Sequence, residues 1–196
     1  NYNQILSDKL GQLEKIFGDV DGEGFNKTLT RFFTSFSELA GNPEDEAIRS
    51  YVRENAAMVS RDFVGMNENL TSIGGDLDTQ ISIQVEDVNE LAKQVAKLNK
   101  KIQLMEANGS EANDLRDQRD MAIRNISKIF KVSTYEDNLH NYNVHIDGAG
   151  TLVAGGMALT LKTGPYKDSN GEVTKGLEVF FEKRPSVPIT KKIKDG

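Results

Sequence analysis

The chain has 196 residues, of which 28% are charged and 37% are hydrophobic, and its net charge is −6. This acidic balance disfavours nucleic acid and anionic membranes as main partners, because both bind clustered cations. The absence of cysteine excludes disulfides, thiolate catalysis and cysteine-bound zinc, and no apolar run approaches the ~20 residues of a membrane span.

Two short helices are predicted in the first part of the chain. Apolar residues from Ile5 to Phe17 recur at helical spacing and stop at a glycine-rich loop, residues 18–24. A second helix is expected from Asn26 to about Ala40, with an apolar side made of Leu29, Phe32, Phe33, Phe36 and Leu39. The following Gly-Asn-Pro segment should end it, and Pro43 suits the first turn of the next helix.

One very long helix is predicted from Ile48 to about Met105. Its apolar residues follow one another at steps of three or four, which is the pattern of a coiled-coil face. Gly74 and Gly75 should weaken a helix by about 1 kcal/mol each relative to alanine, yet the pattern keeps its phase across them. We therefore expect one helix with a bend or flexible point there. About 60 residues would form a rod of roughly 90 Å, which is more typical of an assembly protein than of a compact enzyme.

The remainder of the chain changes from helix to strand. A helix should resume near Ser110 or Asn113 and run to about Lys131, and apolar residues then alternate with a period of two. Turns are expected at residues 147–150 and 169–171. The fold class is α+β, mainly α: an elongated helical bundle or rod with one very long helix, followed by a small antiparallel β region. The expected domains are an α-helical rod domain, residues 1–131, and a β-rich domain, residues 132–196.

The charged segment ANDLRDQRD, residues 112–120, is a candidate metal or catalytic site. At about 100° per residue, Asp114, Asp117 and Asp120 fan across the side of the helix opposite its apolar face. Arg116 should reach Asp120 one turn on and neutralise it, and no histidine is near, whereas a divalent cation needs converging oxygens without competing cations. Asn113 is a plausible N-cap. The pattern favours a charged helix start over chemistry.

Arg119 differs from its charged neighbours because it falls on the apolar face, near Leu115, Ala122 and Ile126. Burying an unpaired charge costs several kcal/mol. We therefore predict that Arg119 pairs with a carboxylate or with backbone carbonyls of a neighbouring segment and locks its helix in place.

Three further patterns carry weaker signals. Residues 19–24, DVDGEG, match the start of a calcium loop but lack the acidic residue at position 12, where Thr30 stands, so a plain loop is favoured. The two histidines, His140 and His145, should point to opposite faces of an extended segment. A basic patch near the C-terminus is expected to be a solvated tail; it comprises Lys183, Arg184, Lys191, Lys192 and Lys194. No catalytic, cofactor-binding or metal-binding residue is predicted.

Three motifs resemble the flagellar hook-associated protein 1 family, the FlgK-type hook–filament junction proteins. The first is the run FFxxFxxLAxxP, residues 32–43, and the second joins VNxL, residues 88–91, to LNxxI, residues 98–102. The third and most specific is a structural signature at a helix start, made of Asn113, Asp114, Leu115, Asp117, Gln118, Arg119 and Asp120. Arg116, within it, stands where the family often has an apolar residue.

This resemblance implies a non-enzymatic axial protein without cofactors, stacked at the junction between hook and filament. Its implied partners are copies of itself, neighbouring axial proteins on the hook and filament sides, and an export chaperone for the full-length protein. It would leave the cell through the flagellar type III pathway without a cleaved signal peptide and act outside the cell. On this resemblance the chain is a middle fragment, expected to be soluble and monomeric or weakly associating, with neither nucleic acid nor membrane as a partner.

Two other classes remain open. One is a different coiled-coil module, for example in signalling, whose apolar seam would form a parallel dimer. The other is a carboxylate-dependent hydrolase built on the three aspartates, which would bind a divalent cation.

Overall fold

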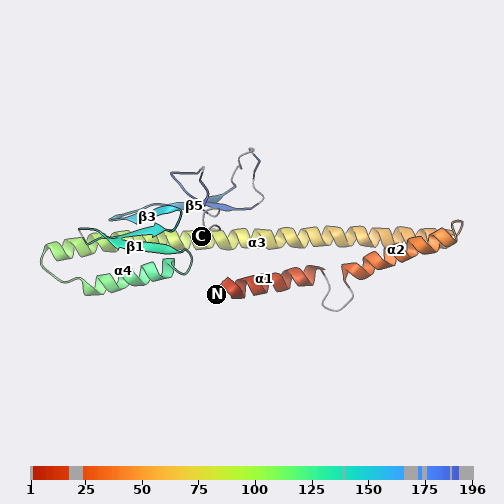
Figure 1. The fold of residues 1–196 in the computed structure, drawn as a ribbon, viewed down its shortest axis with the longest axis horizontal. Helices are drawn as coiled ribbons and strands as arrows, with labels where there is room; N and C mark the ends of the chain where they lie inside the picture. The colour runs from red at the N-terminus through yellow and green to blue at the C-terminus, as the bar shows by residue number, and fades with distance from the viewer. Residues whose placement is uncertain are drawn as a thin grey trace. The chain divides into compact units, whose positions relative to one another are not determined.

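A computed structural model describes residues 2–17, 24–138, 140–165, 172–173, 176–185 and 187–189. The contacts divide the chain into two compact units, Asn1–Asp76 and Leu77–Gly196. The long helix α3 (Glu46–Ala107) contributes residues to both units, and Figure 1 labels helices α1 to α4 and strands β1, β3 and β5. The prediction of a single helix through Gly74 and Gly75 is therefore confirmed.

The first unit contains α1 (Tyr2–Phe17), α2 (Phe25–Gly41) and the beginning of α3. Helix α3 starts after Asp45, whose Oδ1 accepts hydrogen bonds from the backbone N–H groups of Ala47 and Ile48. This is an ordinary N-cap, so Pro43 lies in the turn before the helix and not in its first turn. The rings of Phe25 and Phe63 meet edge to face, with centroids 4.7 Å apart, and pack α2 against α3.

The second unit begins with the remainder of α3, which ends in a left-handed glycine cap. Gly109 has a φ of 76°, its N–H bonds to the carbonyl of Glu106, and the N–H of Ser110 bonds to the carbonyl of Met105. These two bonds form a Schellman motif, which requires glycine because its backbone is left-handed. The turn reverses the chain into α4 (Asn113–Ile126).

Two details of α4 differ from the sequence-based prediction. Its N-cap is Ala112, whose methyl side chain cannot make a capping hydrogen bond. Asn113 is instead the first helical residue, and its side chain donates to Glu111 at 3.0 Å. The helix also ends at Ile126, short of Lys131. Tight turns follow, with Ile129 and Phe130 both donating to the Ile126 carbonyl, and they place Phe130 in the core.

The strands form two small antiparallel sheets. Four strands pair in the order β1-β2-β3-β4, where β1 is Val132–Glu136, β2 is Tyr142–Ile146, β3 is Gly150–Ala154 and β4 is Met157–Ala158. The second sheet pairs β5 (Leu161–Gly164) with β6 (Glu178–Phe181). The predicted turn at residues 147–150 joins β2 to β3, whereas the turn predicted at residues 169–171 lies outside the described residues.

A single hydrophobic core holds the second unit together. It joins one face of α3 to α4 and to both sheets, and its fully buried members include Val88, Ala92, Val95, Ile126, Val144, Leu152 and Leu161. The fold class, mainly α with one very long helix and a small antiparallel β region, is confirmed. The expected division into residues 1–131 and 132–196 stays a prediction, since the described contacts group the strands with α4 and the end of α3.

Candidate functional site: a buried arginine between helix and sheet

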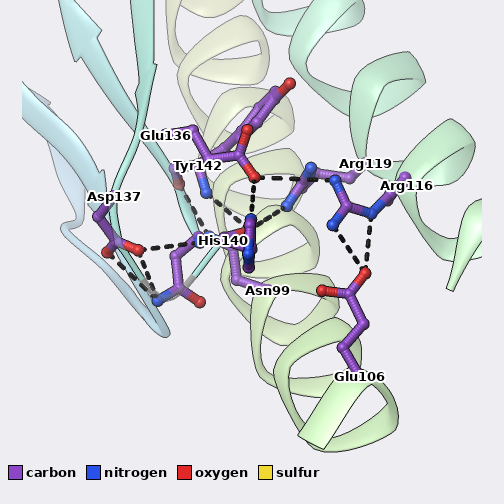
Figure 2. Close-up of polar contacts among 9 residues, drawn as sticks. Asn99, Glu106, Arg116, Arg119, Glu136, Asp137, His140 and Tyr142 are labelled. Carbon is purple, nitrogen blue, oxygen red and sulfur yellow. Dashed lines mark hydrogen bonds and ion pairs between the residues drawn. The ribbon is translucent and has the colours of Figure 1, made fainter. Parts of the chain in front are cut away.

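Arg119 is the largest fully buried side chain of the described residues, with 1% of its surface exposed. It projects from α4 toward α3 and the start of β2, as Figure 2 shows. Its Nη1 donates to the His140 carbonyl at 3.1 Å and to Asn99 Oδ1 at 3.2 Å. Both the predicted burial and the predicted backbone carbonyl partner of Arg119 are therefore confirmed.

The guanidinium of Arg119 also lies over an aromatic ring. Its Cζ is 3.7 Å from the centroid of Tyr142, a distance at which the ring quadrupole attracts a cation. Burial lowers the pKa of Arg119, and Tyr142 and Asp120 act in the opposite direction. An arginine keeps its proton at physiological pH, so a cation is held inside the protein by a ring, a carbonyl and an amide, without a direct carboxylate partner.

Asn99 of α3 connects this arginine to the sheet. Its Nδ2 donates to the carbonyls of Tyr142, at 2.8 Å, and Gly155, at 2.7 Å. Its Oδ1 accepts from Arg119 and from the Tyr142 backbone N–H at 3.2 Å. The amide thus bonds both backbone groups of Tyr142, as a neighbouring strand would, and uses all its hydrogen-bonding capacity.

A more exposed ion-pair chain lies next to this buried group (Figure 2). Arg116 binds Glu106 Oε1 through Nε and Nη2, at 2.9 and 2.7 Å, and its Nη1 is 3.7 Å from Glu136. The hydrogen bond to Glu106 raises the pKa of Arg116. The pairing expected with Asp120 is wrong, because Arg116 turns toward the end of α3 and toward β1. His140 Nδ1 lies 2.9 Å from Glu136 Oε1, within hydrogen-bond distance.

A second amide on α3 repeats the strand-like contact. Asn89 donates to the Leu161 carbonyl at 2.9 Å and accepts from the Leu161 N–H at 2.8 Å. The hydroxyl of Ser82 is 3.2 Å from that of Thr163, and Asp78 accepts from the Leu177 N–H at 3.3 Å. Polar side chains of α3 therefore bond both sheets alongside the apolar core.

Asn89 and Asn99 lie within the family motifs VNxL and LNxxI, but these motifs do not predict that the two amides anchor the sheets. Both directly follow an apolar residue of the α3 core face, Val88 and Leu98. A polar residue beside an apolar stripe on a helix can equally well face solvent. The binding partners of the two amides therefore cannot be predicted without knowing where the strands lie.

The other members of the predicted signature lie at the surface. Asn113, Asp114, Asp117, Gln118 and Asp120 are exposed, and Leu115 is half-buried. The aspartates thus occupy the outer side of α4 as expected. Within the part of the chain that the structure describes, no three histidine or carboxylate side chains are grouped to hold a metal ion. His145 contacts Thr151, away from His140, and residues 19–23 of the calcium-like loop lie outside the described part.

The contacts of this site connect three segments of the chain. The helices α3 and α4 and the β1–β2 hairpin meet at Arg119, Asn99 and Tyr142, and each polar bond joins different segments. None of the helices, over the residues that could be searched, is both long and apolar enough to cross a membrane.

Comparison with known proteins identifies the fold family. The family model described as the helical domain of the flagellar hook-associated protein FlgK matches residues 10–196. The chain belongs to this family. A likeness to FlgK-type proteins was predicted from the three motifs, and it is confirmed.

Relatives and a solved structure agree with this assignment. Flagellar hook-associated protein 1 of Bacillus subtilis (strain 168) is 33% identical over 67% of this chain and 26% of that protein. The protein of the same name from Salmonella typhimurium (strain LT2) is 29% identical over 81% of this chain and 29% of its own length. The flagellar hook junction protein FlgK of Burkholderia pseudomallei shares the fold, with a TM-score of 0.71 and 23% identity over 88% of this chain and 31% of that chain. The chain thus spans less than a third of each of these proteins.

Proposed function

We propose that the chain is part of a structural axial protein of the bacterial flagellum that joins hook to filament by stacking with neighbouring subunits. The proposal is carried by the family match over residues 10–196 and by relatives named as flagellar hook-associated proteins. The described fold suits it, because α3 alone supplies 62 helical residues and the most buried polar site joins segments without grouping reactive side chains. In this proposal the protein catalyses no reaction.

The proposal assigns residues 1–131 to an α-helical rod domain and residues 132–196 to a β-rich domain. The signature around Arg119 serves as a structural lock between them, since it bonds α4 to Asn99 of α3 and to the His140 carbonyl. The partners are copies of the same protein and axial proteins on the hook and filament sides, with an export chaperone before assembly. The full-length protein leaves the cell through the flagellar type III pathway without a cleaved signal peptide and functions outside it.

The decisive experiment localises the full-length protein on the flagellum of its source organism. Immunogold labelling of an epitope-tagged protein should mark a narrow zone between hook and filament, and cells without the gene should carry hooks that lack filaments. Label spread along the filament, or a normal filament in the deletion strain, would refute the proposal.

A matched pair of variants tests the structural lock within this function. Arg119→Ala should impair filament attachment because it removes the buried cation, whereas Arg124→Ala, an exposed arginine of the same helix, should complement the deletion fully. Equal complementation by both variants would mean that the lock does not contribute to the junction.

A further inference from the structure

Strand β1 is an open edge of the four-stranded sheet, and of the features that usually protect such an edge it has only a charged side chain, Glu136. The opposite edge, β4, has only two residues, and short edge strands pair poorly with other chains. In contrast, β1 has five residues, VSTYE, without proline or lysine. The only register shift of the sheet lies between β2 and β3, at Val144 and His145, so β1 itself is regular.

The register shows which backbone groups of β1 face outward. Lys131 accepts from the Asp147 N–H, and Asp137 donates to the Asn141 carbonyl. Hydrogen-bonded residues alternate along an antiparallel pair, so Ser133 and Tyr135 bond β2. The N–H and C=O groups of Val132, Thr134 and Glu136 therefore point away from the sheet. None of them has a backbone partner on that side within the described residues.

The side chains leave room for another strand. Ser133, Thr134, Tyr135 and Glu136 are all exposed, and only Val132 is half-buried. Successive side chains alternate between faces, so both faces of β1 carry exposed side chains. Among them, the Tyr135 ring stacks on His145 and Glu136 contacts Arg116 and His140. Val144 of the neighbouring strand β2 is fully buried in the core. Strand β1, with its exposed side chains, therefore lies at the margin of the core.

We propose that β1 pairs antiparallel with β1 of a second copy, centred on Thr134. Outward-facing residues must meet one another, so Thr134 lies opposite Thr134 of the other copy and Val132 opposite Glu136. This register brings Lys131 opposite Asp137 of the second copy at each end, where Lys131 Nζ also lies 3.8 Å from Asp147 of its own chain and Asp137 accepts from the Asn141 N–H. It also places threonines side by side, a favourable cross-strand pair. The two copies would use the same surface and would be related by a two-fold axis.

We expect this pairing to be weak and reversible because the interface is small. Two five-residue strands cover far less than the ~1,000 Å² expected of a stable interface. The inference rests on the sheet edge alone, and it is independent of the proposed role at the hook–filament junction. A failed pairing would leave that role intact, and a failed localisation experiment would leave the pairing intact.

Amide hydrogen exchange of the 196-residue chain, followed by NMR from about 20 μM to 1 mM, tests the proposal within a single strand. Exchange at Val132, Thr134 and Glu136 should slow as concentration rises, because their N–H groups enter the new ladder. Exchange at Ser133 and Tyr135, which bond β2 in every copy, should not change. Concentration-independent exchange at the three outward amides would overturn the proposal, as would association that protects other surfaces only.

Two variants with one control separate this pairing from general aggregation. Thr134→Pro removes an outward N–H that no β2 group uses, and proline is tolerated on edge strands. It should weaken association more than about tenfold, whereas Thr134→Val, which keeps the N–H, should not. Lys131→Glu should weaken association at low salt and lose this effect at high salt. If Thr134→Pro associates as the unchanged chain does, with its β1–β2 cross-peaks intact, the proposal is wrong.

Discussion

The two parts of α3 share one apolar pattern but differ in what covers it. In the second unit, Val88, Ala92, Val95 and Ile102 are fully buried. In the first unit, Phe63 of the same pattern is 55% exposed and Leu70 is 39% exposed. Helical periodicity is thus sufficient to form α3 along its length. Among the described residues, the dense core lies beside α4 and the sheets, whereas Val52 is the one buried apolar residue of the first unit.

The polar side chains of α3 show the same contrast. In the second unit Asn89 and Asn99 bond the backbone of residues more than forty positions away, whereas in the first unit the Thr71 hydroxyl bonds Asn67, four residues before it. Long-range bonds fix where an element sits relative to others, and local bonds do not. The second unit is therefore where substitutions should have large and specific effects.

Removal of the buried guanidinium should give the largest effect. Arg119→Ala removes one of the two donors to Asn99 Oδ1 and the Arg119 donor to the His140 carbonyl, and it creates a cavity beside Tyr142. We therefore expect the second unit to lose about 3 kcal/mol or more of stability. Native-state hydrogen exchange at the β2 amides measures this loss directly.

The control for that substitution is Arg124→Ala, on the exposed side of the same helix, which should change stability by less than about 0.5 kcal/mol. Arg119→Lys should fall between the two, because lysine keeps the charge but loses the planar contact with the ring. A loss below about 1 kcal/mol for Arg119→Ala would show that the buried cation contributes little.

Substitution of the two α3 asparagines should reduce stability in proportion to the number of hydrogen bonds that each one makes. Asn99→Ala removes bonds to Tyr142, Gly155 and Arg119 at a buried position, and we expect a loss of about 2–3 kcal/mol. Asn89→Ala removes two bonds to Leu161 at a half-buried position and should cost about 1 kcal/mol. Exchange of the β2 and β5 amides distinguishes the two, and equal losses at both positions would contradict the proposed ranking.

A pair of valines tests the contrast between the units directly. Val95→Ala removes two methyl groups from a site with 0% exposure, so we expect a loss of about 2 kcal/mol. Val64 is 55% exposed, and Val64→Ala should be near neutral, since alanine also has the higher helix propensity. Urea unfolding followed by circular dichroism compares them, and a large loss at Val64 would mean that its surface is covered in solution.

The sequence was sufficient to predict the elements whose apolar residues recur at a regular helical spacing. The predicted span of α3 is close to the observed one, and the inward position of Arg119 followed from its place among Leu115, Ala122 and Ile126 on the helix. Both predictions rest on the regular geometry of a helix, which needs no knowledge of what packs against it.

The remaining features depend on contacts between distant segments. Asn99 binds Tyr142 and Gly155, and Arg116 prefers Glu106, ten residues back across the turn, to the nearby Asp120. The early end of α4 accompanies the placement of Phe130 in the core. No local pattern encodes these long-range contacts. The predictions of Asn113 as a cap and Lys131 as a helix end were wrong for local reasons, since Asn113 donates to Glu111 and tight turns follow Ile126.

The smallest expected effect is at the two adjacent glycines of α3. A Cβ added at Gly74 or Gly75 meets no atom within 4 Å, and both residues are helical. Gly74→Ala and Gly75→Ala should therefore each stabilise the helix by about 0.5–1 kcal/mol, because alanine loses less backbone entropy on folding.

Hydrogen exchange at amides 70–80 measures this gain, and Gly109→Ala is the opposite control because its φ of 76° strains an alanine. If the glycines only weaken the helix, both substitutions slow exchange locally and leave the β2 amides unchanged. The two glycines lie beside the boundary between the units at Asp76, and the fold could instead require a bend there. In that case, alanine at either position will destabilise both units.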